Sequence, residues 1–144
     1  MQKNGRNPGV WFESLTFKYF LMKKNLLLFA LAIFGLLTLF MSSSVLFDWF
    51  GIRAKEGHYV PFIVWANWLC GFLYITAAYG VWKNKTWAKI PLFSAMVILI
   101  LAFFGLVIHL TSGGLYETKT PGALAFRLGV TALFLLITKK INQK

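Results

Sequence analysis

The chain of 144 residues contains one cysteine, four acidic residues and few charged residues of any kind. A single cysteine cannot form an intrachain disulfide, a CxxC redox pair or a cysteine-based zinc site, which excludes thiol-relay chemistry. Cys70 lies within an apolar run, where we interpret it as a small helix-packing residue. Charged residues make up 13% of the chain, about half of the roughly 25% found in soluble domains. Much of the surface is therefore expected to face lipid.

The sequence also lacks the motifs of common enzyme classes. There is no GxSxG, no HExxH and no supported serine–histidine–aspartate arrangement. Gly113-Gly114 does not belong to a GxxxxGK[ST] phosphate loop, and we interpret it as a helix stop followed by a turn. No acid stands in the middle of an apolar run, which disfavours export driven by proton exchange at a central carboxylate. These absences favour a protein without enzymatic activity.

Four apolar runs are each long enough to cross a bilayer core, which takes roughly 20 residues. They predict an all-α fold, a bundle of four transmembrane helices within residues 25–138. The spans are expected at residues 26–47, 60–82, 90–110 and 121–138. Pro61, Pro91 and Pro121 stand at the entrances of the last three spans, as suits the first turn of a helix.

Residues 1–24 form an N-terminal segment that is first polar and then both aromatic and basic. Phe12, Leu15, Tyr19 and Met22 recur at helical spacing within it. Two interpretations stay open: a separate short helix in the headgroup region, or a basic flank that extends the first transmembrane helix.

The basic residues are distributed unequally between the two sides of the predicted bundle. Four spans put residues 1–24, the loop at 83–89 and the tail at 139–144 on one side. Eleven of the 15 basic residues lie in these segments: Lys3, Arg6, Lys18, Lys23, Lys24, Lys83, Lys85, Lys89, Lys139, Lys140 and Lys144. The positive-inside rule then predicts a bacterial cytoplasmic (inner) membrane protein with both termini cytoplasmic. Because the positive charge flanks apolar runs, we do not expect nucleic-acid binding.

With this topology, three of the four acids and both histidines lie on the outer side, where any binding site is expected. The candidates for ligand binding are Arg127, Glu117, Asn67 and Lys119. Arg127 lies six residues after Pro121, roughly 9 Å along the helix. A guanidinium at this depth costs a few kcal/mol unless it pairs or extends to the surface. Three alternatives stay open for the Arg127 side chain. It extends to the membrane surface; it forms a structural contact, either an ion pair with Glu117 or Asp48 or a hydrogen bond to Asn67; or it contacts a substrate or anion.

Two histidines and nearby carboxylates also form a candidate metal site. Its residues are His58, His109, Glu117 and Asp48. Zinc, copper and iron accept such ligands, so a single metal ion is the cofactor alternative; a single haem held by the two histidines is another. However, no HxxxH or HxxE spacing places two ligands on one helix face. The ordinary alternative is that both histidines are interfacial and bond to solvent or carbonyl groups.

The segment Gly57-His58-Tyr59-Val60-Pro61-Phe62, with Asn67 and Gly71-Phe72-x-Tyr74 downstream, resembles small bacterial inner-membrane proteins of four helices. In length, number of spans and placement of the termini, the chain is also similar to the DoxX-like group. The resemblance implies the same architecture and no particular activity or site residue.

Three classes of function follow from these features. The first is a non-enzymatic accessory or assembly component that acts through helix packing, with a membrane-protein partner or further copies of itself. The second is an outer-face ligand- or metal-binding protein for transport, sensing or redox work, using His58, His109, Glu117 and Arg127. The third is a small oligomeric transporter.

Overall fold

The computed structural model describes residues 7–142, which fold into α-helices joined by short turns. The helices are α1 (Pro8–Leu46), α2 (Ile52–Glu56), α3 (Pro61–Trp82), α4 (Lys89–Thr111) and α5 (Thr120–Asn142), with 3₁₀ turns at Trp49–Gly51 and Thr86–Ala88. The four long helices are apolar and long enough to cross a membrane. The predicted all-α fold with four candidate spans is therefore confirmed.

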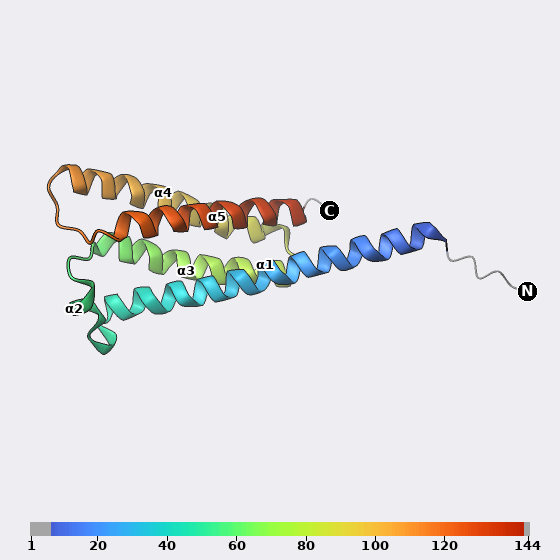
Figure 1. Ribbon diagram of the computed structural model, residues 1–144, viewed down its shortest axis with the longest axis horizontal. Helices are drawn as coiled ribbons and strands as arrows, with labels where there is room; N and C mark the ends of the chain where they lie inside the picture. The colour runs from blue at the N-terminus through green and yellow to red at the C-terminus, as the bar shows by residue number, and fades with distance from the viewer. Residues whose placement is uncertain (1–6, 143–144) are drawn as a thin grey trace, which may run out of the picture.

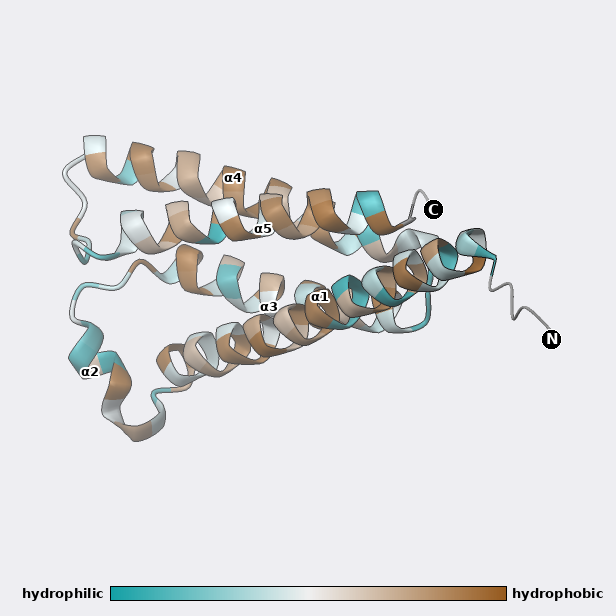
Figure 2. Cartoon of the chain, turned by 45° about the vertical axis from the view of Figure 1, so that its right-hand side comes forward, coloured by the Kyte–Doolittle hydropathy of each residue, from teal (hydrophilic) through white to brown (hydrophobic). Residues whose placement is uncertain are grey.

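The four long helices pack in chain order, each against the long helix that follows it. The main contacts are between α1 and α3, between α3 and α4, and between α4 and α5. Contact between α1 and α5 is much sparser. The described chain begins and ends at the same end of the bundle (Figure 1). Hydrophobic residues dominate the long helices, whereas α2 and the helix ends are more hydrophilic (Figure 2).

Helix α1 is longer than the first predicted span. It is one continuous helix of 39 residues, about 58 Å at 1.5 Å per residue, whereas a bilayer core is about 30 Å thick. Of the two interpretations of the N-terminal segment, the structure shows the extension, and α1 projects past the other helices (Figure 1). At the opposite terminus, α5 continues through Lys139 and Lys140, so part of the predicted tail is helical.

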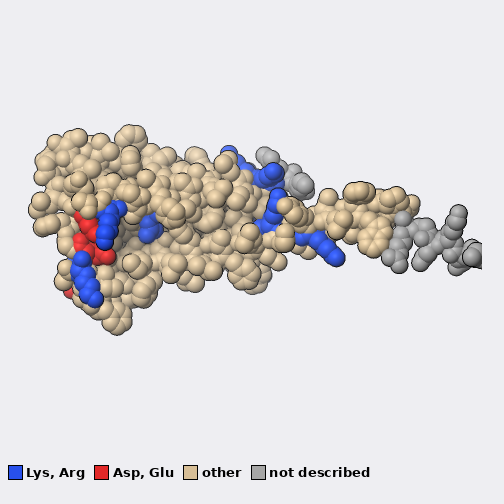
Figure 3. Space-filling model, in the orientation of Figure 1, with Lys and Arg blue, Asp and Glu red and all other residues tan. Residues whose placement is uncertain are grey.

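The two ends of the bundle carry different charged groups. The lysine end, where the described chain begins and ends, carries Lys23, Lys24, Lys83, Lys85, Lys89, Lys139 and Lys140. The acid end carries Asp48, Arg53, Lys55, Glu56, Glu117 and Lys119. Figure 3 shows the two groups separated by an uncharged stretch. Lys24 Nζ donates to the carbonyl oxygen of Trp82 at 3.4 Å, so Lys24 lies level with the last turn of α3.

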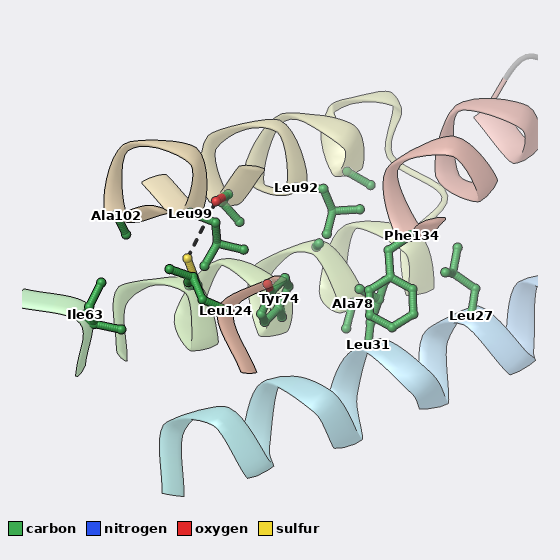
Figure 4. Close-up of a cluster of buried hydrophobic side chains, with 14 of the residues drawn as sticks. Leu27, Leu31, Ile63, Tyr74, Ala78, Leu92, Leu99, Ala102, Leu124 and Phe134 are labelled. Carbon is green, nitrogen blue, oxygen red and sulfur yellow. Dashed lines mark hydrogen bonds between the residues drawn. The ribbon is translucent and has the colours of Figure 1, made fainter. Parts of the chain in front are cut away.

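Close packing of α1 against α3 depends on two glycines that face the partner helix. A Cβ added to Gly71 would lie 2.6 Å from Leu39 Cγ, and one added to Gly35 would lie 2.9 Å from Ile75 Cγ1. Small residues of this kind let membrane helices approach closely. Buried apolar side chains from all four long helices fill the core, as the close-up shows (Figure 4). Within it, the Cys70 thiol donates to the carbonyl oxygen of Ala95 at 3.7 Å, consistent with its interpretation as a packing residue.

Candidate functional site

A cavity of about 260 Å³ opens at the acid end between α1, α3, α5 and the segments that precede α3 and α5. All four ligand-binding candidates line it: Arg127, Glu117, Asn67 and Lys119. Further polar residues that line it are Ser42, Glu56, Tyr59 and Thr120. Acidic and basic side chains gather around a hollow at this end of the molecule (Figure 3). The fold thus brings polar residues from three long helices to one cavity.

Arg127 is bound by a neutral group rather than by an acid. Its Nη1 donates to Thr38 Oγ1 on α1 at 2.9 Å, and its guanidinium carbon lies 6.0 Å from the ring centroid of Phe34. Among residues 7–142, no carboxylate lies within 4.0 Å of the guanidinium. The considered pair with Glu117 or Asp48 is therefore not formed, because Arg127 faces α1 across the bundle.

The turn of α5 that carries Arg127 is tied to α3 by a chain of two hydrogen bonds. Thr131 Oγ1 donates to the backbone carbonyl of Arg127 at 2.7 Å. This bond uses the only hydroxyl proton of Thr131, so in the 2.6 Å contact between the two hydroxyls Tyr74 is the donor. Both side chains are fully buried. The pair fixes the backbone from which Arg127 reaches into the cavity.

Asn67 contributes a polar atom that has no partner within the described chain. Its amide oxygen is buried and accepts no hydrogen bond from residues 7–142, so the bond to Arg127 that the sequence suggested is absent. A buried acceptor left unpaired costs about 1–3 kcal/mol. Since Asn67 lines the cavity, a donor on a molecule bound there would remove this cost.

Two acids approach each other near the mouth of the cavity. Burial raises the pKa of Glu56 above its ordinary value, and so do a side-chain hydrogen bond to Glu117 and the negative charge of Glu117, whereas Lys119 lowers it. The raised pKa means that the folded protein favours the protonated form of Glu56 more than the unfolded chain does. Lys119 Nζ lies 4.0 Å from Glu117 Oε1, and the Lys119 side chain is 86% exposed, so this ion pair contributes little to stability.

Two residues of the candidate metal site, His109 and Asp48, form hydrogen bonds elsewhere in the chain. His109 Nε2 donates to the carbonyl oxygen of Leu115 at 3.0 Å, in the turn after α4. Asp48 Oδ1 accepts the backbone N–H of Arg53 at 3.2 Å, and His58 is exposed. In the part of the chain that the structure describes, no group of three or more histidine, cysteine or acidic residues is placed to hold a metal ion. The geometry thus favours the cavity over the metal site.

The sequence identified Arg127, Glu117 and Lys119 as site candidates but not the residues that position Arg127. Thr38, Tyr74 and Thr131 look like ordinary members of apolar runs, and only the rotation of each helix about its axis brings them to Arg127. Glu56 also lines the cavity although the sequence did not single it out as a ligand-binding candidate, because its proximity to Glu117 depends on how α2 and the segment before α5 meet.

Comparisons of the chain with protein-family models, with curated proteins and with solved structures each found no match. The resemblance to the DoxX-like group therefore stays a prediction.

Proposed function

We propose that this polytopic membrane protein binds a small carboxylate-bearing ligand in the acid-end cavity, with Arg127 as the anion partner. The observation that carries the proposal is the environment of Arg127. This guanidinium lines a cavity, bonds to a neutral hydroxyl, and has no carboxylate within ion-pair distance among residues 7–142. Guanidinium donors match the geometry of a carboxylate and form two parallel hydrogen bonds with it. A bound anion therefore supplies the charge partner that the described chain does not.

The size and polarity of the cavity restrict the ligand further. A volume of about 260 Å³ lies below the ~300–1,000 Å³ of sites for drug-sized molecules, which favours a compact ligand. The unpaired Asn67 oxygen requires a donor. A short hydroxy acid or amino acid meets both conditions, because its carboxylate pairs with Arg127 while its hydroxyl or amino group donates to Asn67.

The test uses the full-length chain purified in detergent and its melting temperature in the presence of glycolate, with acetate as the matched anion that lacks the hydroxyl donor. Bound ligand at a hundred times its Kd stabilises a protein by about 2.7 kcal/mol. We expect glycolate to raise the melting temperature more than acetate does. Arg127→Met should abolish the effect of both anions, and Asn67→Leu should abolish the difference between them.

Lys55→Met is the matched control, because Lys55 is exposed at the same end and does not line the cavity. It should leave both anion effects unchanged. Equal anion effects in the wild-type and Arg127→Met proteins would refute the proposal, as would an effect lost equally in the Lys55→Met control.

The charge distribution supports a cytoplasmic location for the lysine end, in a bacterial inner membrane. The cavity then opens to the outside and takes its ligand from there. Labelling of single cysteines in intact cells tests this orientation, with Lys55→Cys at the acid end and Lys85→Cys at the lysine end, each in a Cys70→Ala background. A membrane-impermeant maleimide should label only the Lys55→Cys protein, and labelling of only the Lys85→Cys protein would reverse the topology.

A second candidate function, an accessory or assembly component, is favoured by the projecting part of α1. Phe12, Leu15 and Phe17 there are 71%, 59% and 62% exposed, beyond the level marked by Lys24. Large exposed apolar surfaces mark contacts with protein or with membrane. This helix therefore offers a surface for another membrane protein.

An environment-sensitive dye at Phe12→Cys, in a nanodisc that holds one copy of a Cys70→Ala chain, distinguishes a protein partner from lipid. A water-like spectrum means that lipid alone does not cover the helix, as the accessory role requires. A lipid-like spectrum means that the membrane surface covers it, and the accessory role then loses its structural support.

A further inference from the structure

A second cavity lies at the opposite end of the α1–α5 contact. There α1 and α5 enclose a groove of about 810 Å³. Its membrane-facing part is lined by apolar residues from both helices: Leu26, Leu27, Ala30, Leu133, Phe134 and Ile137. Lys23 and Lys140 line the same groove at the level of the lysine end, one on each helix. None of these residues belongs to the acid-end cavity, so the groove is a separate feature.

The two lysines lie at headgroup depth, and within residues 7–142 neither has an acidic partner. Lys23 precedes Lys24, which bonds to the last turn of α3 and so marks the end of the spans. Lys23 Nζ lies 4.6 Å from the ring centroid of Tyr19. Across residues 7–142, neither Lys23 nor Lys140 has a carboxylate within 4.0 Å. Two ammonium groups thus flank an apolar groove, and the described part of the chain supplies no counter-ion for them.

We propose that this groove binds an anionic phospholipid, with its phosphate between Lys23 and Lys140 and an acyl chain along the apolar walls. The apolar part lies between two candidate membrane spans, so the hydrocarbon chains of bilayer lipids have direct access to it. Charge complementarity selects the headgroup, because two unpaired lysines favour a net negative lipid over a zwitterionic one. A second copy of the chain is the competing occupant, and the test below separates the two.

The experiment is native mass spectrometry on the delipidated full-length protein in detergent. Phosphatidylglycerol and phosphatidylcholine with identical acyl chains are added in equal amounts, and the bound lipids are counted. We expect the wild type to prefer phosphatidylglycerol. The double variant Lys23→Gln/Lys140→Gln should lose roughly thirtyfold in affinity for it, since each lysine contributes about 1 kcal/mol.

Two further variants make the result specific to the groove. Lys18→Gln/Lys139→Gln removes the same charge from residues that do not line the groove, and it should retain the preference. Ala30→Phe fills the groove without changing charge, and it should weaken binding of both lipids. The Lys18→Gln/Lys139→Gln protein should also match the wild type in melting temperature, which shows that the loss of two lysine charges does not by itself disturb folding.

Three results would overturn the proposal. One is equal retention of the two lipids by the wild type, and another is equal loss of preference in both lysine double variants, which would indicate a diffuse charge effect. The third is a dimer cross-linked through Ile137→Cys in a Cys70→Ala background, formed in phosphatidylglycerol nanodiscs, which would identify a second copy as the occupant.

Discussion

The neutral partner of Arg127 leads to a prediction opposite to that of a buried ion pair. Replacing Arg127 with Met loses one hydrogen bond to a charged group, about 1.5–3 kcal/mol. It also removes a charge within a membrane span, which costs at least ~2.5 kcal/mol at a helix centre. The two effects oppose each other and are similar in size. We therefore expect Arg127→Met to change the free energy of unfolding of the ligand-free protein by less than about 1 kcal/mol.

Thr38→Val perturbs the same contact from the other side and should behave differently. Thr38 is 2% exposed, and removing its hydroxyl leaves an N–H of the Arg127 guanidinium without a hydrogen-bond acceptor. The expected cost is about 1–3 kcal/mol, at the upper end because the donor is charged. In the Arg127→Met protein, by contrast, the Thr38 hydroxyl can bond to the backbone carbonyl one turn earlier.

The assay is unfolding in mixed detergent micelles, followed by tryptophan fluorescence, on the wild type, the two single variants and the double variant. The double variant should recover most of the loss seen in Thr38→Val, because it no longer contains an unpaired guanidinium. A loss of 3 kcal/mol or more in Arg127→Met would refute this reasoning, since breaking a buried ion pair costs about 3–5 kcal/mol. It would mean that an acid pairs with Arg127 in solution.

Three further predictions concern separate parts of the bundle. Because the pKa of Glu56 is raised, protonated Glu56 stabilises the fold below pH ~4.3, and this stabilisation is lost as the pH rises through the raised pKa. Melting temperatures measured across this pH range should show the loss in the wild type and not in Glu56→Gln. Thr131→Val leaves the buried hydroxyl of Tyr74 without its acceptor and should cost about 1–3 kcal/mol, more than Tyr74→Phe at about 0.5–1.5 kcal/mol, in detergent unfolding. Gly71→Val should prevent folding because the added side chain clashes with α1, whereas Gly129→Ala, with open space around it, should be neutral or stabilise by up to about 1 kcal/mol. The yield of each variant after size-exclusion chromatography measures its folding. A well-folded Gly71→Val protein would contradict the close packing of α1 against α3.

The sequence was sufficient for the number of candidate spans and for the end of the bundle at which the charged candidates meet. Both follow from the lengths of apolar runs and from the alternation of loops between the two ends. It was insufficient for α1, because residues 10–24 mix aromatic and basic side chains that suit a separate surface helix as well as an extension. The structure decides this by continuing the helix from Pro8 without a break.

The partners within the cavity could not be read from the sequence. Arg127 and Thr38 are 89 positions apart, and their contact depends on how α1 and α5 are rotated about their axes. The sequence left several environments open for Arg127, and an acidic partner was one of them because buried charges are usually paired. In the fold, Glu56 and Glu117 line the cavity and interact with each other instead of with Arg127.

Both proposed sites lie along the sparse contact between α1 and α5, and Phe34 stands between them. Its ring centroid is 5.8 Å from that of Phe134, which lines the groove, and 6.0 Å from the guanidinium carbon of Arg127, which lines the cavity. A second edge-on ring contact, at 5.2 Å, joins Phe34 to Tyr74 on α3. Together with the Thr38–Arg127 hydrogen bond, Phe34 thus sets the spacing between α1 and α5 in the stretch between the two sites.

We therefore predict that Phe34→Leu weakens both sites at once. It removes two aromatic pairs, each worth about 0.5–1.5 kcal/mol, so the free energy of unfolding in detergent should fall by about 1–3 kcal/mol. The stabilisation by glycolate and the preference for phosphatidylglycerol should both decrease. Phe29→Leu, on the same helix and 64% exposed, is the matched control and should change neither. If Phe34→Leu altered one site alone, the two ends of the α1–α5 contact would be mechanically independent.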